Sequence, residues 1–220
     1  MELNRKIKGI IKYIIPIRGR LFLYGIVPKI YLLNTYLLRE PKLITNLSSI
    51  EGKYLIRAIN WDDEQKLRKA HTFRGPGSFS KRIPDRLNSP EWVGLAVFDK
   101  NIGDIAYMAW VIVKSIKYFE EFGIHLQSGQ FLLKDGFCVP DYRHQGLHTR
   151  MEQERINYCI RNGATEIFIQ IHNSNEKGKD SVVKNGYNLF HQHYIIQWPV
   201  FNIYRDLKAF LKNPFIKVVK

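Results

Sequence analysis

The sequence predicts an α/β (α+β) fold in which helices flank a sheet, and three observations support this class. The length of 220 residues suits one domain with an extension. Hydrophobic residues make up 45% and charged residues 25% of the chain, as is usual in globular proteins. Short apolar runs alternate with amphipathic segments, most clearly from residue 131 to residue 163, where a strand is followed by a turn and a helix.

Six segments have the composition or the alternation of strands. They comprise residues 53–59, 92–98, 105–113, 131–139, 165–172 and 191–198. Helices are expected after Trp61, where acidic residues fill the first turn, from 147 to 158, in a short stretch before Gly186, and from 201 to 220. Residues 74–91 and 118–127 read as long irregular segments, the first of them rich in Gly, Pro, Ser and Arg.

The positive charge is concentrated at the two ends of the chain. The net charge is +14, and residues 1–43 contribute nine basic against two acidic residues. Pro16 and Pro28 would break this apolar, aromatic segment into short helices. We therefore expect three parts: a basic helical extension (1–50), a core domain (51–198) and a basic C-terminal helix (199–220). The ends could lie on an anionic membrane surface or pack on the core as a flap.

The cysteines and the apolar runs indicate a cytoplasmic protein. Cys138 and Cys159 fall on a predicted strand and helix without metal-ligand spacing, which favours reduced, buried thiols. No cleavable signal peptide is visible, and no run reaches the roughly 18–20 apolar residues that span a bilayer. Peripheral attachment at the inner face of the membrane is compatible with the basic ends. The sequence gives no oligomeric state and no metal site.

The turn at residues 140–146 has the properties of a diphosphate site. Pro140 ends the preceding strand, and a helix begins after Gly146. A strand that enters a helix through such a turn directs unpaired N–H groups and the positive end of the helix dipole at one point. Arg143 adds a full charge, and Gly146 lets an anion approach the backbone. A nucleotide P-loop is excluded because no Gly-Lys-Ser/Thr follows.

Residues 139–148, VPDYRHQGLH, resemble the acyl-CoA motif of the Gcn5-related N-acetyltransferase (GNAT) superfamily, Arg/Gln-x-x-Gly-x-Gly/Ala. Arg143 and Gly146 match this motif, whereas His148 occupies the position of its last Gly or Ala. Downstream, residues 184–187 resemble the closing Lys-x-Gly-Phe/Tyr signature of the family. The resemblance covers about residues 53–198, with its elements in the same order.

The resemblance implies a mixed, mostly antiparallel sheet of six to seven strands that is splayed at residues 131–139. It also implies that acetyl-CoA is the acyl donor. The residues implied in binding it are Phe137, Cys138, Val139, Arg143, His144, Gln145, Gly146, Leu147, His148 and Asn175. Asn173 competes with Asn175 for the last place. Many members carry a tyrosine as general acid where this chain has Val182, so that role is vacant or filled elsewhere.

Acyl transfer also needs an oxyanion donor and a proton acceptor. The resemblance places the oxyanion donor at a backbone N–H near Cys138 on the central strand. Asp135 is the first candidate for the base, because a carboxylate buried on an apolar strand would have a raised pKa. Its alternative is a locally satisfied turn residue. Rival bases are Glu121, His125, His172 and His193, and water could also carry the proton.

The first functional hypothesis is an acyl-CoA-dependent N-acyltransferase that acetylates the amine of an amino sugar, nucleotide- or lipid-linked, in polysaccharide or cell-envelope synthesis. The basic loop at residues 74–91 supports an acceptor that carries phosphate. One alternative is acetylation of a protein lysine or N-terminus. Another is a non-catalytic acyl-CoA-binding or membrane-associated protein with a GNAT core. Nucleic acid is not favoured as a partner, because no reading helix or stacking motif accompanies the charge.

Overall fold

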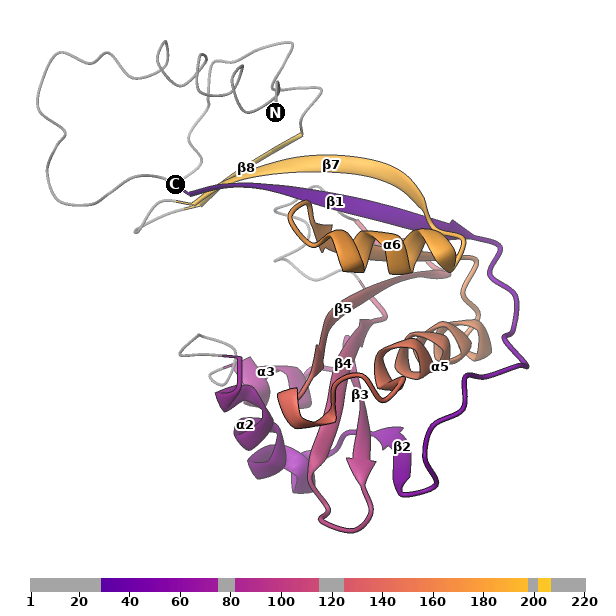
Figure 1. Cartoon of the computed structure of the whole chain (residues 1–220). Helices are drawn as coiled ribbons and strands as arrows, with labels where there is room; N and C mark the ends of the chain where they lie inside the picture. Colours follow the sequence, from indigo (N-terminus) through magenta and orange to yellow (C-terminus); the bar gives the residue numbers. More distant parts are fainter. Residues whose placement is uncertain (1–28, 75–81, 115–124, 198–201, 207–220) are drawn as a thin grey trace, which may run out of the picture.

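The residues that the structure describes form one eight-stranded sheet flanked by helices. The computed structural model describes residues 29–74, 82–114, 125–197 and 202–206 (Figure 1). The strands are β1 (Lys29–Arg39), β2 (Tyr54–Ala58), β3 (Trp92–Asp99), β4 (Ile105–Ile112), β5 (Gln130–Cys138), β6 (Glu166–His172), β7 (Asn188–Gln197) and β8 (Asn202–Asp206). Their order is β2-β3-β4-β5-β6-β1-β7-β8, and only the β5–β6 pair is parallel. The predicted mixed, mostly antiparallel sheet is confirmed.

Strand β1 corrects the expectation of a helical extension over residues 1–50. It lies inside the sheet, antiparallel to both β6 and β7, with Leu33 opposite His172 on one side and His193 on the other. The run from Leu33 to Leu37 is buried, as expected of an interior strand that is covered on both faces. Polar Asn34 and Thr35 lie within this buried run, so neither its hydropathy nor its periodicity distinguishes a strand from a helix. The core therefore begins at residue 29, and residues 1–28 lie outside the described part.

Strand β8 corrects the predicted C-terminal helix in the same way. Residues 202–206 pair with the end of β7, from His193 opposite Asp206 to Gln197 opposite Asn202. The remainder of that predicted helix, residues 207–220, lies outside the described residues. Together β1 and β8 account for eight strands where six to seven were expected.

The helices cover the two faces of the sheet. On one face lie α2 (Glu64–Thr72), which follows the 3-10 turn η1 (Trp61–Asp63), and α3 (Ile83–Asn88); here Leu67 and Ile83 pack against Met108. Because α3 lies within residues 74–91, that segment is only partly the expected loop. On the opposite face lie α5 (Leu147–Arg161) and α6 (Glu176–Lys184), with Ile156 and Val182 in one cluster with Leu133 and Ile169. No helix among the described residues is long and apolar enough to span a membrane.

Strands β5 and β6 separate partway along their length. They pair only from Gln130 opposite Glu166 to Leu133 opposite Ile169, after which β5 pairs with β4 alone. A bulge lies at the point of separation: Trp110 pairs with Lys134 and Met108 with Phe137, and Asp135 has a positive φ of 51°. The expected splay at this strand is thus present, and we call the region beyond Leu133 and Ile169, where the two strands share no backbone pairs, the slot.

Candidate functional site

The turn after β5 leads into the N-terminus of α5 with a geometry that suits an anion, and we call this turn the cradle. The chain leaves β5 through the 3-10 turn η3 (Pro140–Tyr142), and α5 begins after Gly146, whose φ is 74°. A Cβ at Gly146 would come no closer than 3.7 Å to another atom, so the backbone conformation and not crowding favours glycine. The first helical bond runs from Arg150 N–H to Gly146 O at 3.1 Å. The N–H groups that precede it point out of the helix N-terminus, where they attract anions.

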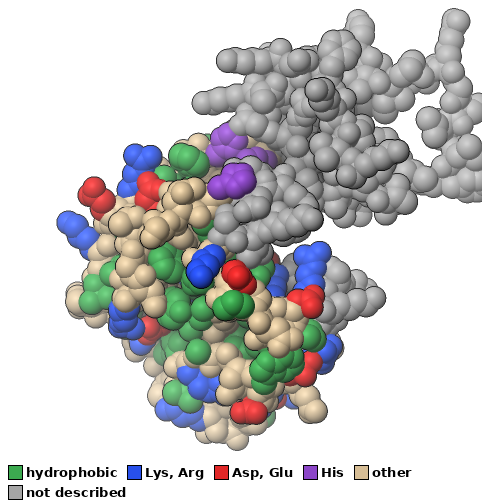
Figure 2. Space-filling view, turned by 180° about the vertical axis from the view of Figure 1, so that it is seen from behind, with side chains coloured by type: hydrophobic (Ala, Val, Ile, Leu, Met, Phe, Trp, Pro, Cys, Tyr) green, Lys and Arg blue, Asp and Glu red, His purple; other side chains and the backbone are tan. Residues whose placement is uncertain are grey.

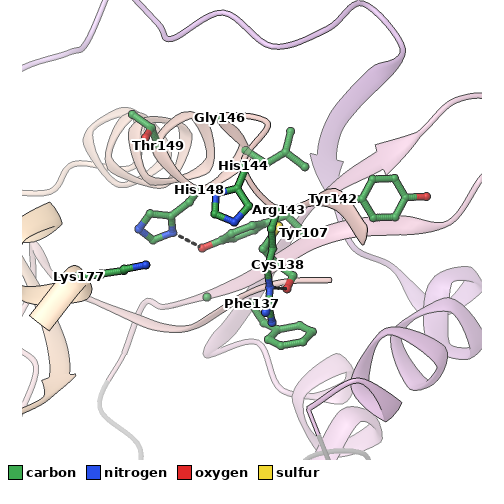
Figure 3. Close-up of a pocket in the computed structure, with 12 residues that line it drawn as sticks. Tyr107, Phe137, Cys138, Tyr142, Arg143, His144, Gly146, His148, Thr149 and Lys177 are labelled. Atoms are coloured by element: carbon green, nitrogen blue, oxygen red, sulfur yellow. Dashed lines mark hydrogen bonds between the residues drawn. The ribbon is translucent and has the colours of Figure 1, made fainter. Parts of the chain in front are cut away.

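A cavity of about 510 Å³ opens at this helix N-terminus (Figure 3). Seven of the ten residues expected to bind the cofactor line it: Phe137, Cys138, Arg143, His144, Gly146, Leu147 and His148. Tyr107 of β4 and Lys177 of α6 complete its polar wall. Arg143 Nε donates to the Cys138 carbonyl at 3.4 Å, and among the described residues its guanidinium pairs with no carboxylate. Two cations and a helix N-terminus therefore surround one cavity.

The other three expected residues have structural roles outside this cavity. Val139 is buried, and its N–H donates to Ala106 O at 3.0 Å. Gln145 accepts a hydrogen bond from the Tyr54 hydroxyl. Asn175 caps α6 by accepting from Gly178 N–H at 3.0 Å, and its rival Asn173 accepts from Asn34 Nδ2 at 3.2 Å.

His148 bridges the two sides of the cavity. Its Nδ1 lies 2.8 Å from the Tyr107 hydroxyl (Figure 3). Its Nε2 lies 3.4 Å from Ser181 Oγ of α6. The pKa of His148 is below its ordinary value, because the surrounding protein disfavours the charged ring more than Glu152 stabilises it. The ring is therefore neutral at pH 7. Val182, where the family's tyrosine would stand, is buried in the core, so its neighbour Ser181 is the α6 side chain that approaches His148.

Tyr107 fits against β5 only because residue 136 is glycine. A Cβ at Gly136 would lie 2.6 Å from the Tyr107 hydroxyl oxygen, and the next atom of that ring is 3.6 Å away. Gly136→Ala should therefore destabilise the fold by about 1–3 kcal/mol, since it overpacks this contact. In a Tyr107→Phe background the same substitution should cost much less, because the clashing oxygen is gone. Chemical denaturation of the four proteins measures both values, and equal costs in the two backgrounds would contradict the contact.

Cys138 presents its backbone to the slot. The N–H of the next residue, Val139, points to β4, so alternation along the strand turns the N–H and C=O of Cys138 away from β4. The Arg143 bond to the Cys138 carbonyl agrees with this direction. Burial raises the pKa of the Cys138 thiol despite the opposing charge of Arg143, so the thiol stays protonated and is a poor nucleophile. A backbone oxyanion donor at Cys138 is compatible with this geometry.

Asp135 differs from the expected base. Burial alone would raise its pKa, but the charges of Arg86, Lys134 and Arg74, together with an Arg86 hydrogen bond, outweigh burial and lower it. Arg86 Nη2 lies 2.5 Å from Asp135 Oδ2, and both side chains are largely buried. The expectation of a raised pKa is therefore wrong, because the sequence did not show that α3 would bring a guanidinium to this carboxylate. An ionised, ion-paired carboxylate is a weak proton acceptor.

The rival bases that the structure describes lie on β6, on β7 and before β5. Glu121 lies outside the described residues, His125 is exposed before β5, and His172 is exposed at the end of β6. His193 is buried in β7, with its ring centre 4.3 Å from that of His191. Seen from behind, histidine side chains gather in one patch beside segments drawn in grey (Figure 2). None of the described rivals lines the cavity at the cradle.

Sequence reasoning missed Lys134, which lies at the start of the slot. Its Nζ donates to Gln170 Oε1 of β6 at 2.5 Å, so two side chains join the strands just beyond the last backbone pair. Burial lowers the pKa of Lys134 to about 8, Asp135 opposes this shift, and Arg86 adds to it. The available signal was a lysine directly after Phe131, Leu132 and Leu133 on an otherwise apolar strand.

The splayed sheet and the glycine-ended cradle define an α/β architecture that solved structures share. No protein-family model matches the chain, and no curated protein matches it in sequence. Among solved structures, it resembles a GCN5-related N-acetyltransferase from Sphaerobacter thermophilus, with a TM-score of 0.56, 15% identity, and coverage of 81% of this chain and 54% of the other. A tandem GNAT protein from the clavulanic acid biosynthesis pathway has a TM-score of 0.59 and 8% identity, and the match covers 80% of this chain and 54% of the other. For the ribosomal-protein-S18-alanine N-acetyltransferase from Escherichia coli the TM-score is 0.50 and the identity 14%, and the match covers 61% of this chain and 77% of the other.

These structures show that the chain has the GNAT fold, as its motifs indicated. The chain spans about half the length of the first two structures. At identities of 15% and below, the likeness establishes the fold, and the activity has to be argued from the site.

Proposed function

We propose that the protein is an acyl-CoA-dependent N-acyltransferase with acetyl-CoA as the simplest donor. The observation that carries this proposal is the cradle beside the slot. Arg143, Lys177 and the α5 N-terminus surround one cavity and suit a diphosphate, while the slot beyond Leu133 exposes the backbone of Cys138. A thioester that extends from the cradle into the slot would meet an N–H donor for the developing oxyanion.

Thermal denaturation with CoA and acetyl-CoA, followed by thiol release with a panel of amines, tests this function. Stabilisation by both ligands, together with thiol release that depends on an amine, is the expected result. The absence of stabilisation by either ligand would overturn the donor site. Stabilisation without thiol release for any amine would favour the alternative of a non-catalytic acyl-CoA-binding protein.

For the acceptor we propose an amino sugar that carries phosphate, as a nucleotide- or lipid-linked sugar does, in polysaccharide or cell-envelope synthesis. Arg74 supports this proposal, because it lies close to Asp135 on the α2 and α3 side of the sheet. The amine panel therefore includes amino-sugar nucleotides, the matching neutral amino sugars and a lysine peptide. Preference for the peptide would support the alternative of a protein acetyltransferase.

We also propose that the basic N-terminal residues place the enzyme on the inner face of the membrane. Residues 1–28 contain six basic residues and one acidic residue among many apolar and aromatic ones. A cation near an anionic surface contributes about 1 kcal/mol, so Lys8→Ser should weaken binding to phosphatidylserine vesicles roughly fivefold. Lys184→Ser, an exposed lysine of α6, is the matched control. Equal sedimentation of the two variants and the parent protein would contradict attachment through the N-terminus.

A further inference from the structure

Lys134 lies on the face of the sheet opposite the donor cavity. Its strand neighbour Leu133 packs in the cluster formed with α5 and α6, and so does Ile169, the neighbour of Gln170. Because successive side chains of a strand point to opposite faces, Lys134 and Gln170 point to the side of α2 and α3. Trp110, the β4 partner of Lys134, confirms this side, since Arg86 of α3 lies 5.2 Å from its ring centre. The slot thus has the cradle on one face and Lys134 on the other.

The partner of Lys134 across the slot is a neutral amide. Gln170 Oε1 accepts one N–H of Lys134, and Gln170 Nε2 lies 3.5 Å from Thr35 Oγ1 of β1, which fixes the orientation of the amide. An amide oxygen holds a lysine in place without stabilising its charge as strongly as a carboxylate would. It can also accept from the neutral amine, whose nitrogen lone pair then remains available to a proton.

Among the described residues, charged groups from three elements lie around Lys134. Asp135 follows it on β5, Arg86 approaches from α3, and His172 lies close enough on β6 for its own pKa to be lowered by Lys134. Asp135 in turn is engaged by Arg86 and lies near Arg74 and His71. Burial is the main reason why the pKa of Lys134 falls to about 8. Near neutral pH an appreciable fraction of Lys134 is therefore the neutral amine, the form that can act as a base.

We propose that Lys134 is the general base that removes the proton from the acceptor amine, and that Gln170 is the positioning residue that holds its nitrogen at the slot. This inference rests on the proposed acyltransferase function. The thioester reaches the slot from the cradle side, and the amine approaches from the side of Lys134. The amine nitrogen forms a bond to the thioester carbon, and the C–S bond breaks with its electron pair leaving on the CoA thiolate. The surplus amine proton passes to Lys134 Nζ, and the resulting ammonium later returns it to water.

The first test measures the titration of Lys134 without reference to activity. In the full chain with ¹³Cε-labelled lysine, the Lys134 signal is the one that Lys134→Met removes and Lys42→Met, an exposed lysine, leaves in place. We expect its midpoint near 8, whereas an unperturbed lysine titrates at about 10.4. A Lys134 midpoint that coincides with the other lysines would overturn the assignment as base.

The second test measures kcat/KM for thiol release as a function of pH. In the parent protein it should rise with the deprotonation of Lys134, and Lys134→Met should lower it by about 10²- to 10⁴-fold, the usual contribution of a general base. Lys134→Arg should be equally impaired, because guanidinium does not deprotonate near neutral pH. Stabilisation by CoA should remain unchanged in both variants. Gln170→Leu should shift the pH profile while leaving CoA stabilisation intact.

The outcomes separate this inference from the proposed function. If the parent protein releases thiol and Lys134→Met retains kcat/KM within threefold, Lys134 is not the base and the acyltransferase stands. If CoA fails to stabilise the parent protein, the donor site falls, and the role of Lys134 as base falls with it, whatever the lysine titration shows. If both lysine variants lose CoA stabilisation, Lys134 acts on donor binding and the proposal is overturned.

Discussion

Arg155→Met should destabilise the protein by about 3–5 kcal/mol, because it leaves a buried carboxylate without its partner. Arg155 and Glu152 form an ion pair on α5, and both side chains are 2% exposed. Burial disfavours the charge of Arg155, but Glu152 and the neighbouring Tyr107 and Tyr187 outweigh this and raise its pKa, so the guanidinium stays charged. Chemical denaturation gives the free energy of unfolding directly.

The matched control removes both charges at once. Glu152→Leu combined with Arg155→Met should be far less destabilised than Arg155→Met alone, since a hydrophobic pair of similar volume often replaces a buried ion pair at little cost. If the double variant is as unstable as the single one, packing of the arginine stem and not the unpaired charge is responsible.

The position of this ion pair links stability to the site. Arg155 Nη1 donates to the Lys134 carbonyl at 3.4 Å, and Lys134 is the first β5 residue beyond the last β5–β6 pair. A buried guanidinium thus binds the strand backbone where the sheet opens. The folded Arg155→Met variant should therefore also bind CoA less tightly than the folded parent protein, because the strand at the edge of the slot loses this hydrogen bond.

Local chemistry made the cradle predictable. Pro140, Arg143 and Gly146 fix a strand end, a charge and a helix start within seven residues, and Arg143 and Gly146 line one cavity in the structure. Strand β1 was not predictable in this way. Whether a short segment such as Leu33–Leu37 becomes a strand or a helix depends on partners 131 or more residues away, in β6 and β7. Tertiary pairing decides such segments, and local periodicity does not.

The residues of the chemical step were harder to predict than the cradle. Asp135 and Lys134 are adjacent, and burial on an apolar strand shifts both towards the neutral form. Their charge states differ in the structure because Arg86, 49 residues earlier, ion-pairs with Asp135, whereas Lys134 faces the uncharged Gln170. The sequence shows neither of these long-range partners. The direction of the pKa shift of Asp135 could therefore not be predicted from the sequence, although its place on the central strand could.

Arg143→Ala should weaken the binding of CoA and acetyl-CoA by roughly 10- to 100-fold. A hydrogen bond to a charged group contributes about 1.5–3 kcal/mol, and an arginine–phosphate contact belongs to this class. The fold should be little affected, because Arg143 is exposed and its contact with the Cys138 carbonyl is long, at 3.4 Å. Isothermal titration gives the affinity, and thermal denaturation without ligand checks the fold.

The control for Arg143 is Arg161→Ala at the other end of the same helix. Arg161 is also exposed and carries the same charge, so any effect of net charge on a polyanionic ligand appears equally in both variants. A loss of affinity confined to Arg143→Ala assigns the effect to the cradle, where the helix dipole and the guanidinium act on the same anion. High salt should reduce the difference between the variants, because screening weakens an exposed charge pair. Equal affinities of Arg143→Ala and the parent protein would refute the cradle as the diphosphate site, and Lys177 would then be the first cation to test at the opposite wall of the cavity.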